Sequence, residues 1–275
     1  MSKENDSFGD RMKMFEMAEA GRRLMPQLPI IARIDGQGFS KFTRGLNRPY
    51  DERLSKLMVA TTKYLVEKTE AQCGYTQSDE ITLGWRGDNR EMLYSGRISK
   101  LTSALAAWAT GFFNKKMPEF LPEEWQEKIA TFDCRVWNMP NLAEGANAFL
   151  WREQDATKNS ISMAARAYYS HKAIKNKKGP EMQEMLWQKG INWNDYPAFF
   201  KRGTYIQRRL VQRPFTPEEV NQLPEKHDYF RNPQLIVERT ECIALELPPL
   251  KKVLNRAKVI FNGHDPVISE ENEKK

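Results

Sequence analysis

The stretch R-I-D-G-Q-G-F at residues 33–39 follows a short apolar run and leads into a turn. Residues 29–32 are apolar in the manner of a buried strand, so the chain reaches Asp35 where that strand ends. Gly36 and Gly38 permit a tight turn and allow the backbone to approach a ligand closely. The stretch therefore predicts a strand whose end presents a carboxylate and an accessible carbonyl oxygen.

A second acidic stretch, G-Y-T-Q-S-D-E-I-T-L at residues 74–83, reads as a β-hairpin with Ser78, Asp79 and Glu80 at its turn. Taken singly, Asp-Gly and Ser-Asp are ordinary turn formers, and each segment has a bland alternative as a turn without function. Taken together, the two stretches bring acids to two strand ends. Magnesium is usually held by one or two carboxylates together with substrate phosphate, so two aspartates suffice for such a site.

The pattern around these stretches predicts the fold. Leu57, Met58 and Leu65 recur at helical spacing after Asp51, which we expect to cap that helix. A second apolar stripe predicts a helix over residues 91–116, and residues 132–137 alternate as a strand. The order is strand, helix, strand, strand, helix, strand, which is the ferredoxin-like arrangement also used by polymerase palm domains.

We therefore predict an α+β protein with a ferredoxin-like (palm-type) antiparallel sheet and helices on one face, plus helical and basic C-terminal elaborations. Residues 1–136 are expected to form the palm-like catalytic core. Residues 137–275 are expected to form a helical extension and a basic C-terminal region, with the alternative that both parts make one continuous domain. A short strand is expected near residues 235–237.

Composition agrees with a polyanionic partner. The formal net charge is +7, which favours nucleic acids through counterion release. The three cysteines are widely separated and form no C-x-x-C pair, which argues against zinc and for a reducing compartment. No apolar stretch approaches the roughly 20 residues of a membrane span, and the N-terminus lacks a signal-peptide pattern. We expect no membrane association and a cytoplasmic location.

Six ordered motifs resemble those of the tRNA(His) guanylyltransferase superfamily. R-I-D-G-Q-G-F is similar to that family's R-x-D-G-R-x-F, G-Y-T-Q-S-D-E to G-Y-G-Q-S-D-E, and R-I-S-K at residues 97–100 to R-x-S-K. F-D-C-R-V at 132–136 resembles F-D-G-R-V, W-R-E-Q-D at 151–155 resembles W-R-Q-x-D, and K-R-G-T at 201–204 resembles R-K-G-T. The resemblance fades after Thr204. It implies an enzyme that adds nucleotides to RNA 5′ ends in the 3′-to-5′ direction.

One departure narrows the expectation. Members that add an extra guanosine to tRNA(His) carry H-I-N-N-L-Y-N where this chain has T-K-N-S-I-S-M, at residues 157–163. In this segment the chain resembles the Thg-like branch of the superfamily. The expected function is therefore template-dependent 3′-to-5′ addition of nucleotides that repairs the 5′ end of tRNA. The alternatives are a tRNA(His) guanylyltransferase adding a single 5′ guanosine, a non-catalytic RNA-binding module, and a nucleotide cyclase. The cyclase gives no reason for W-R-E-Q-D and K-R-G-T.

The resemblance also implies substrates, partners and roles. ATP would first adenylylate a 5′-monophosphate, and the 3′-hydroxyl of an incoming nucleoside triphosphate would then displace AMP. The implied cofactors are two Mg²⁺ ions, with ATP and GTP as substrates; the implied partners are a tRNA or tRNA-like 5′ end and other copies of the chain in a homotetramer. The implied catalytic residues are Asp35, Asp79 and Glu80, and the implied metal ligands are Asp35, Gly36 and Asp79. Nucleotide binding falls to Arg33, Gln37, Gly38, Phe39, Ser40, Arg48, Ser78, Arg97 and Lys100, and RNA binding to Asn159, Lys201, Arg202, Arg208 and Arg209.

Overall fold

A six-stranded antiparallel sheet forms the centre of the molecule. The computed structural model describes residues 7–88 and 92–268. The strands run in the order β4-β1-β3-β2-β5-β6. Their bounds are β1 (Ile30–Gly36), β2 (Cys73–Gln77), β3 (Glu80–Trp85), β4 (Phe132–Asn138), β5 (Thr204–Pro214) and β6 (Ile236–Leu245). The first four strands have the ferredoxin-like order, so the predicted fold class is confirmed.

Two helices cover one face of this sheet, as predicted. Helix α3 (Glu52–Thr69) begins at its N-cap Asp51, whose side chain accepts a hydrogen bond from the backbone N–H of Arg53. Helix α4 (Ile98–Phe120) lies beside α3, and the core between helices and sheet includes fully buried Ile34, Leu65 and Leu105. The predicted N-cap and both predicted amphipathic helices are therefore present.

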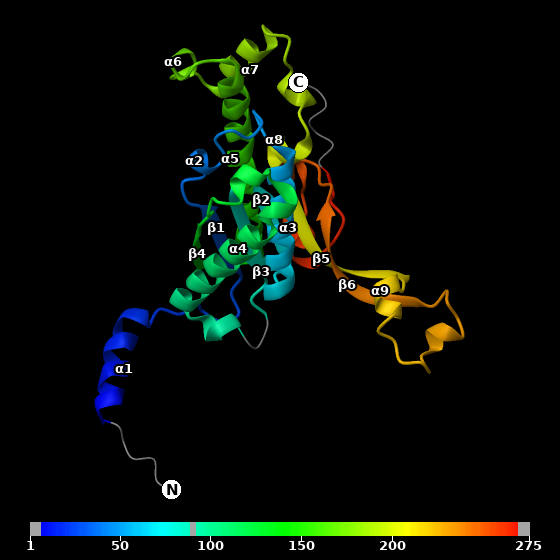
Figure 1. Cartoon of the computed structure of the whole chain (residues 1–275). Coiled ribbons are helices and arrows are strands. Elements are labelled where there is room, and N and C mark those ends of the chain that lie inside the picture. Colours follow the sequence, from blue (N-terminus) through cyan, green and yellow to red (C-terminus); the bar gives the residue numbers. More distant parts are fainter. Residues whose placement is uncertain (1–6, 89–91, 269–275) are drawn as a thin grey trace.

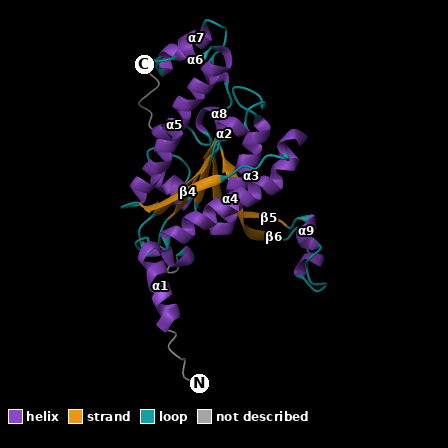
Figure 2. Ribbon diagram, turned by 60° about the vertical axis from the view of Figure 1, so that its left-hand side comes forward, coloured by secondary structure: helices purple, strands orange, loops and turns teal. Residues whose placement is uncertain are grey.

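The opposite face is covered as well, by helices from the second half of the chain. Helix α5 (Leu142–Tyr168) lies on that face (Figure 2). Together with the short α10 (Arg256–Asn262) it packs there around Ile31, Phe149 and Phe261. The expectation of helices on one face holds for α3 and α4 only. The apolar run of β1 is the physical reason for the second layer, because consecutive buried residues require cover on both faces.

Helix α4 begins later than the apolar stripe predicts. The expected start, Glu91, lies outside the described residues. Residues of the 3₁₀ turn η1 (Leu93–Gly96) precede the helix, with Tyr94 and Ser95 at positive φ, and Arg97 takes the N-cap position. These backbone conformations interrupt any helix through them, so Ile98 is the first α-helical residue and the helix continues to Phe120.

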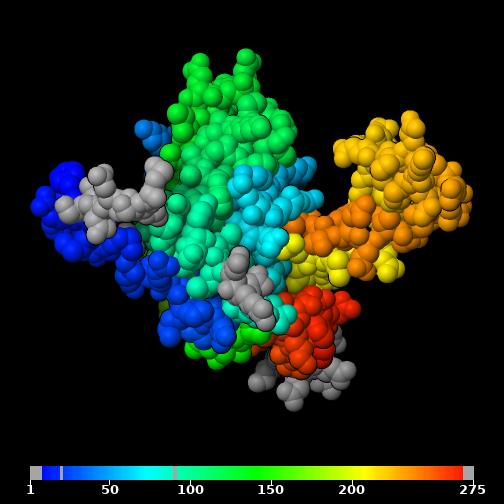
Figure 3. All heavy atoms as spheres, turned by 90° about the horizontal axis from the view of Figure 1, so that it is seen from below, coloured from blue at the N-terminus to red at the C-terminus, as the bar shows by residue number. Residues whose placement is uncertain are grey.

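Strands β5 and β6 widen the sheet and then leave it. Only the first four residues of β5 pair with β2, whereas β5 pairs with β6 from Tyr205 to Pro214, so the outer half of the ribbon extends away from the body as an arm (Figures 1 and 3). At its end, Arg213 forms ion pairs with Glu219 and Glu241. The remaining helices are α1 (Ser7–Ala20), α2 (Phe39–Phe42), α6 (His171–Ile174), α7 (Gly179–Trp187), α8 (Ala198–Arg202) and α9 (Pro217–Val220). No helix within the described ranges is long and apolar enough to cross a membrane.

Candidate functional site

The two acidic stretches meet at one end of the sheet. Strands β1 and β3 are neighbours, and their register places Asp35 opposite Glu80. Asp79 precedes Glu80 in the hairpin turn, and its carbonyl accepts a hydrogen bond of 3.1 Å from the backbone N–H of Gly36. Asp35, Gly36 and Asp79 therefore lie together, as the two strand ends predict.

The hairpin turn that presents Asp79 is short and strained. Gln77 pairs with Glu80, which leaves Ser78 and Asp79 as a two-residue loop, and Ser78 has φ 55°. Two-residue hairpins require such left-handed conformations, which non-glycine residues adopt at a cost. The Ser78 hydroxyl donates to Oδ1 of Asp79 at 2.9 Å, which fixes the carboxylate relative to the turn.

The turn after Asp35 is shaped by an aromatic cluster. A Cβ at Gly36 would lie 2.3 Å from the Phe39 ring, so glycine is required by close packing. Phe39 is only 4% exposed and packs against Phe113 and Phe132. The Phe39 side chain belongs to the core, so the predicted nucleotide contact of Phe39 could come only from its backbone.

Charges at the site are distributed unevenly. Glu80 is 14% exposed and pairs with Arg152, whose Nη2 lies 2.7 Å from Oε2 of Glu80 and 3.0 Å from Asp155. Burial raises the pKa of Glu80 against the opposing effect of Arg152. Burial also raises the pKa of Asp79, and the nearby charge of Asp35 adds to that rise. The Arg152 guanidinium therefore compensates Glu80, whereas Asp35 and Asp79 share a region of excess negative charge.

This arrangement fits the magnesium site implied by the sequence. Asp35, Asp79 and the Gly36 carbonyl are hard oxygen donors, and a divalent cation would relieve the repulsion between the two carboxylates. No group of three or more His, Cys, Asp or Glu side chains positioned to hold a metal occurs in the described residues. Two carboxylates plus a carbonyl leave positions for water and phosphate, as magnesium prefers. The Glu80 carboxylate is held by Arg152, so both of its oxygens already have a partner within the protein.

Several residues predicted to bind nucleotide gather near these acids. Gln37 and Gly38 lie in the turn after Gly36, and Ser40 lies in α2; Gly38 has φ 65° and is the N-cap of α2. The backbone N–H of Gln37 donates to the carbonyl of Thr131, so it is already occupied. The Arg33 side chain lies 4.0 Å from Glu80.

A small cavity marks the other side of the hairpin. Its volume is about 60 Å³, and Tyr50, Asp51 and Ser78 are among the residues that line it. Arg48 is exposed in the loop that leads to Tyr50. Ser78 therefore lies on the side of the acids that faces α3.

Arg97 and Lys100 do not join the site within one chain. Arg97 forms a β-bridge with Arg23, and Leu24 bonds to Gly96, which places the start of α4 near the beginning of β1. Asp35 lies at the other end of that strand. Along α4, Phe113 packs on Phe132 beside the site, and 16 residues of helix correspond to about 24 Å.

The residues predicted to bind RNA fall into two separate groups. Asn159 is exposed on α5, and Lys201 and Arg202 end α8; the Lys201 ammonium contacts the Asn194 carbonyl and lies 5.5 Å from the Trp193 ring. Arg208 and Arg209 are successive residues of β5 and therefore point to opposite faces of the ribbon. The structure does not unite these five residues in one surface.

Two arginines at the site were missed by sequence reasoning. Arg152 neutralises Glu80, and Arg135 lies 4.0 Å from Asp35 and 3.4 Å from Asp133. Both belong to motifs that were recognised, W-R-E-Q-D and F-D-C-R-V, so the available signal was an unassigned arginine within each motif. Only the fold brings them to the acids.

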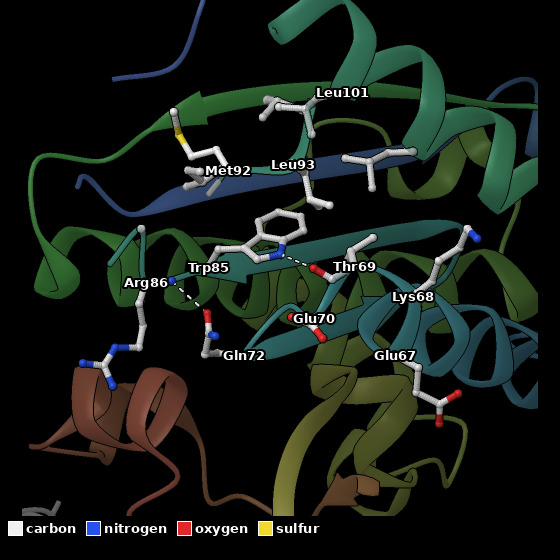
Figure 4. Close-up of a pocket in the computed structure, with 14 residues that line it drawn as sticks. Glu67, Lys68, Thr69, Glu70, Gln72, Trp85, Arg86, Met92, Leu93 and Leu101 are labelled. Carbon is white, nitrogen blue, oxygen red and sulfur yellow. Dashed lines mark hydrogen bonds between the residues drawn. The ribbon is translucent and has the colours of Figure 1, made fainter. Parts of the chain in front are cut away.

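A separate cavity lies at the far end of the sheet, where β3 ends. Its volume is about 280 Å³, and Trp85, Leu93 and Leu101 form part of its apolar wall (Figure 4). The Trp85 indole N–H donates to the carbonyl of Thr69, and the Arg86 backbone N–H donates to Gln72. These bonds fix the wall of the cavity, which is remote from Asp35 and Asp79.

Comparisons with known proteins show which family this chain is similar to. Residues 9–140 match the family model described as tRNAHis guanylyltransferase. An uncharacterized protein, R259, of Acanthamoeba polyphaga mimivirus is 32% identical over 76% of this chain and 79% of its own length. The tRNA(His) guanylyltransferase of Schizosaccharomyces pombe is 28% identical over 74% of this chain and 82% of its own length.

Solved structures show the same likeness. A bacterial tRNA(His) guanylyltransferase (Thg1)-like protein in complex with ATP superposes with a TM-score of 0.68 and 39% identity, over 73% of this chain and 88% of that one. A bacterial protein of the same description in complex with GTP has a TM-score of 0.69 and 32% identity, over 90% and 95% of the two chains.

Proposed function

Because this chain belongs to the tRNA(His) guanylyltransferase family, we propose that it is a template-dependent 3′-to-5′ nucleotidyltransferase that repairs the 5′ end of tRNA. Members of this family are nucleotidyltransferases. We therefore prefer this activity for the chain over a nucleotide cyclase or a non-catalytic RNA-binding module. The observation that carries the proposal is the meeting of Asp35, Gly36 and Asp79 at one end of the sheet, with Glu80 already neutralised by Arg152.

The proposed reaction consists of two displacements at phosphorus. An oxygen of the RNA 5′-monophosphate attacks the α-phosphorus of ATP, and pyrophosphate leaves. The 3′-hydroxyl of the incoming nucleoside triphosphate then attacks the activated 5′-phosphorus, and AMP leaves. Both displacements depend mainly on positioning and on charge neutralisation.

The residues of the chain divide this work. Asp35, Asp79 and the Gly36 carbonyl would hold two Mg²⁺ ions, which supply neutralisation of phosphate charge when bound. The backbone at residues 38–40 and the exposed Arg48 would contact the triphosphate, and Ser78 orients Asp79 through its hydrogen bond. The ion pair between Glu80 and Arg152 holds the hairpin against α5, so that Asp79 keeps its place beside Asp35 and Gly36.

The proposed choice of substrate depends on residues 157–163 of α5, which differ from the H-I-N-N-L-Y-N motif. Thr157 and Ser162 stand where guanosine-adding members carry histidine and tyrosine, and Met163 lines the small cavity together with Tyr50 and Ser78. The segment therefore lies next to the proposed nucleotide side of the site. Without the histidine and tyrosine, pairing with the opposing acceptor-strand base would select the incoming nucleotide.

A second candidate function is addition of a single guanosine to tRNA(His). It is favoured by the names of the curated relatives from yeasts, which are 26–28% identical. One experiment separates the two functions: incubation with each labelled nucleoside triphosphate and with tRNAs that carry intact or truncated 5′ ends.

The template-dependent proposal predicts extension of a tRNA lacking its first nucleotide, with the incorporated base changing when the opposing base is changed. Guanosine insertion whatever the opposing base, on full-length tRNA(His) in preference to truncated tRNA, would replace the proposal by the second candidate.

We also propose that the chain forms a homotetramer and is located in the cytoplasm. Light scattering of the purified protein tests the first proposal, and cell fractionation tests the second. If Arg97 and Lys100 contact a triphosphate, the structure requires that another copy of the chain supply them, because both lie at the opposite end of β1 from Asp35.

A further inference from the structure

A groove beside the acids is lined by arginine and tryptophan. It lies between the edge of the sheet at β4 and the first half of α5, with a volume of about 500 Å³. Arg33 and Arg135 form its floor with Trp137, and Trp151 stands on its helical wall. We call these four residues the arginine–tryptophan groove.

The groove begins two residues along β1 from Asp35. Arg33 and Asp35 lie two apart on β1 and share a face, and the register pairs Arg33 with Arg135 and Asp35 with Asp133. Two strand residues span about 6.6 Å. A nucleoside whose 5′-phosphate lies at Asp35 therefore reaches into the groove.

Trp151 offers a stacking surface. The side chain is 50% exposed although it stands at a crowded site. The guanidinium carbons of Arg152 and Arg33 lie 4.5 and 5.7 Å from its ring centroid. An exposed indole flanked by cations is the chemistry with which proteins stack bases of single-stranded nucleic acid.

The cations of the groove lack full pairing among the residues that the structure describes. Nε of Arg33 is buried and has no hydrogen-bond partner among the described residues, and the nearest carboxylate, Glu80, lies 4.0 Å away and is shared with Arg152. A buried donor without an acceptor calls for one from outside. Arg135 is 53% exposed and makes only long contacts, 3.4 Å to Asp133 and 4.0 Å to Asp35.

We propose that this groove holds the 5′-terminal nucleotide of the RNA, with its base stacked on Trp151 and its phosphate oxygens contacted by Arg33 and Arg135. The inference rests on the proposed function and names the partner of that same site. The attacking and leaving groups approach phosphorus from opposite sides. The small cavity at Tyr50 and Ser78 faces α3, beyond the hairpin, so the groove over β1 and β4 is the side that remains for the RNA end.

Kinetics of single variants test the proposal. Trp151→Ala should raise the KM for RNA on the order of tenfold to a hundredfold, because base stacking on an aromatic ring contributes that much binding. The KM for the nucleoside triphosphate should stay within about twofold, and Trp151→Phe should restore most of the loss. Trp187→Ala is the matched control, because Trp187 is 63% exposed on α7. Circular dichroism establishes that each variant is folded.

A cross-linking experiment reads the contact without catalysis. A tRNA with 4-thiouridine as its first nucleotide is irradiated with the full-length protein in metal-free buffer, and the cross-linked peptide is identified by mass spectrometry. Cross-linking at Trp151 or the adjacent groove residues supports the proposal.

The possible failures are distinguishable. If the wild-type protein adds nucleotides to no RNA, the proposed function fails and takes the inference with it. If the wild type extends RNA while Trp151→Ala leaves the RNA KM unchanged, only the groove assignment is overturned. If the KM for the nucleoside triphosphate rises while the KM for RNA is unchanged, the groove binds the incoming nucleotide, and the proposal is overturned in that case too.

Discussion

The ion pair between Glu80 and Arg152 joins the hairpin to α5. Both side chains are largely buried, and Arg152 also contacts Asp155 and the Trp151 ring. Sequence patterns place Glu80 at a turn but say nothing of a partner 72 residues later. The meeting of Asp35 and Asp79 could be predicted because it depends on where two strands end, which is a local property; their role in the reaction stays a prediction. The neutralisation of Glu80 depends on a contact that only packing creates.

Breaking this pair on one side should destabilise the fold. Arg152→Ala leaves a buried carboxylate without its cation, and such changes cost about 3–5 kcal/mol of the free energy of unfolding. Urea denaturation measures this value. Combining Arg152→Met with Glu80→Gln should recover most of the loss, because the buried carboxylate is then removed together with its cation. A single variant as stable as the wild type would show that the pair does not fix the hairpin.

Glu153 gives a pH-dependent prediction. It is 4% exposed and accepts hydrogen bonds from the Tyr205 hydroxyl at 3.0 Å and the Leu250 N–H at 2.8 Å. Burial raises its pKa above the ordinary glutamate value of 4.5 despite these bonds. The folded state therefore binds this proton more tightly than the unfolded state, and stability is lost as pH rises from 4.5 through the raised pKa.

The substitution Glu153→Gln removes the loss of stability at rising pH, because glutamine does not ionise. Its side-chain oxygen can still accept the hydrogen bond from the Leu250 N–H. We expect a higher Tm than the wild type at pH 7, with a difference that shrinks below pH 4.5. Thermal unfolding followed by circular dichroism across this range provides the measurement. A difference that is constant with pH would mean that the titration of Glu153 is not its cause.

At the scale of elements, the sequence predicts what is periodic along the chain. The first four strands, α3 and α4 follow from alternation and helical spacing, and their order predicts the ferredoxin-like sheet. The β5–β6 ribbon was not predicted as such, because its pairing depends on residues about 30 positions apart. The cover of α5 over the second face is equally non-local. Positive φ values at Tyr94 and Ser95 account for the misplaced start of α4.

Close packing at the turn after β1 predicts the effect of substituting Gly36 on the stability of the protein. Gly36→Ala should destabilise the protein by about 1–3 kcal/mol, because the added Cβ overlaps the ring of Phe39. Gly111→Ala is the matched control. Gly111 is exposed within α4 and has free space around it, so alanine there should stabilise by about 0.5–1 kcal/mol. Equal effects of the two changes would remove the packing argument at Gly36.

At the scale of the whole molecule, the separation of Arg97 and Lys100 from the acids carries a consequence. The proposed role of these two residues in triphosphate binding is compatible with this separation only if one copy of the proposed homotetramer completes the site of another. Lys100→Ala and Asp79→Asn should then each be inactive alone, while a refolded mixture recovers part of the activity. Transfer of labelled nucleotide to tRNA measures the recovery. Mixed oligomers without recovered activity, or an active Lys100→Ala protein, would separate Lys100 from the site.

The most direct test of the account is transfer of a labelled nucleotide to a 5′-truncated tRNA by the wild type, Asp35→Ala and Asp79→Ala. Each substitution removes a preorganised charge from the reacting phosphates, so we expect losses of roughly a thousandfold or more. Circular dichroism spectra should stay unchanged. Asp88→Asn, an exposed aspartate paired with Arg86 at the far end of β3, should remain active. Folded Asp35→Ala and Asp79→Ala proteins with near wild-type turnover would contradict the assignment of the site.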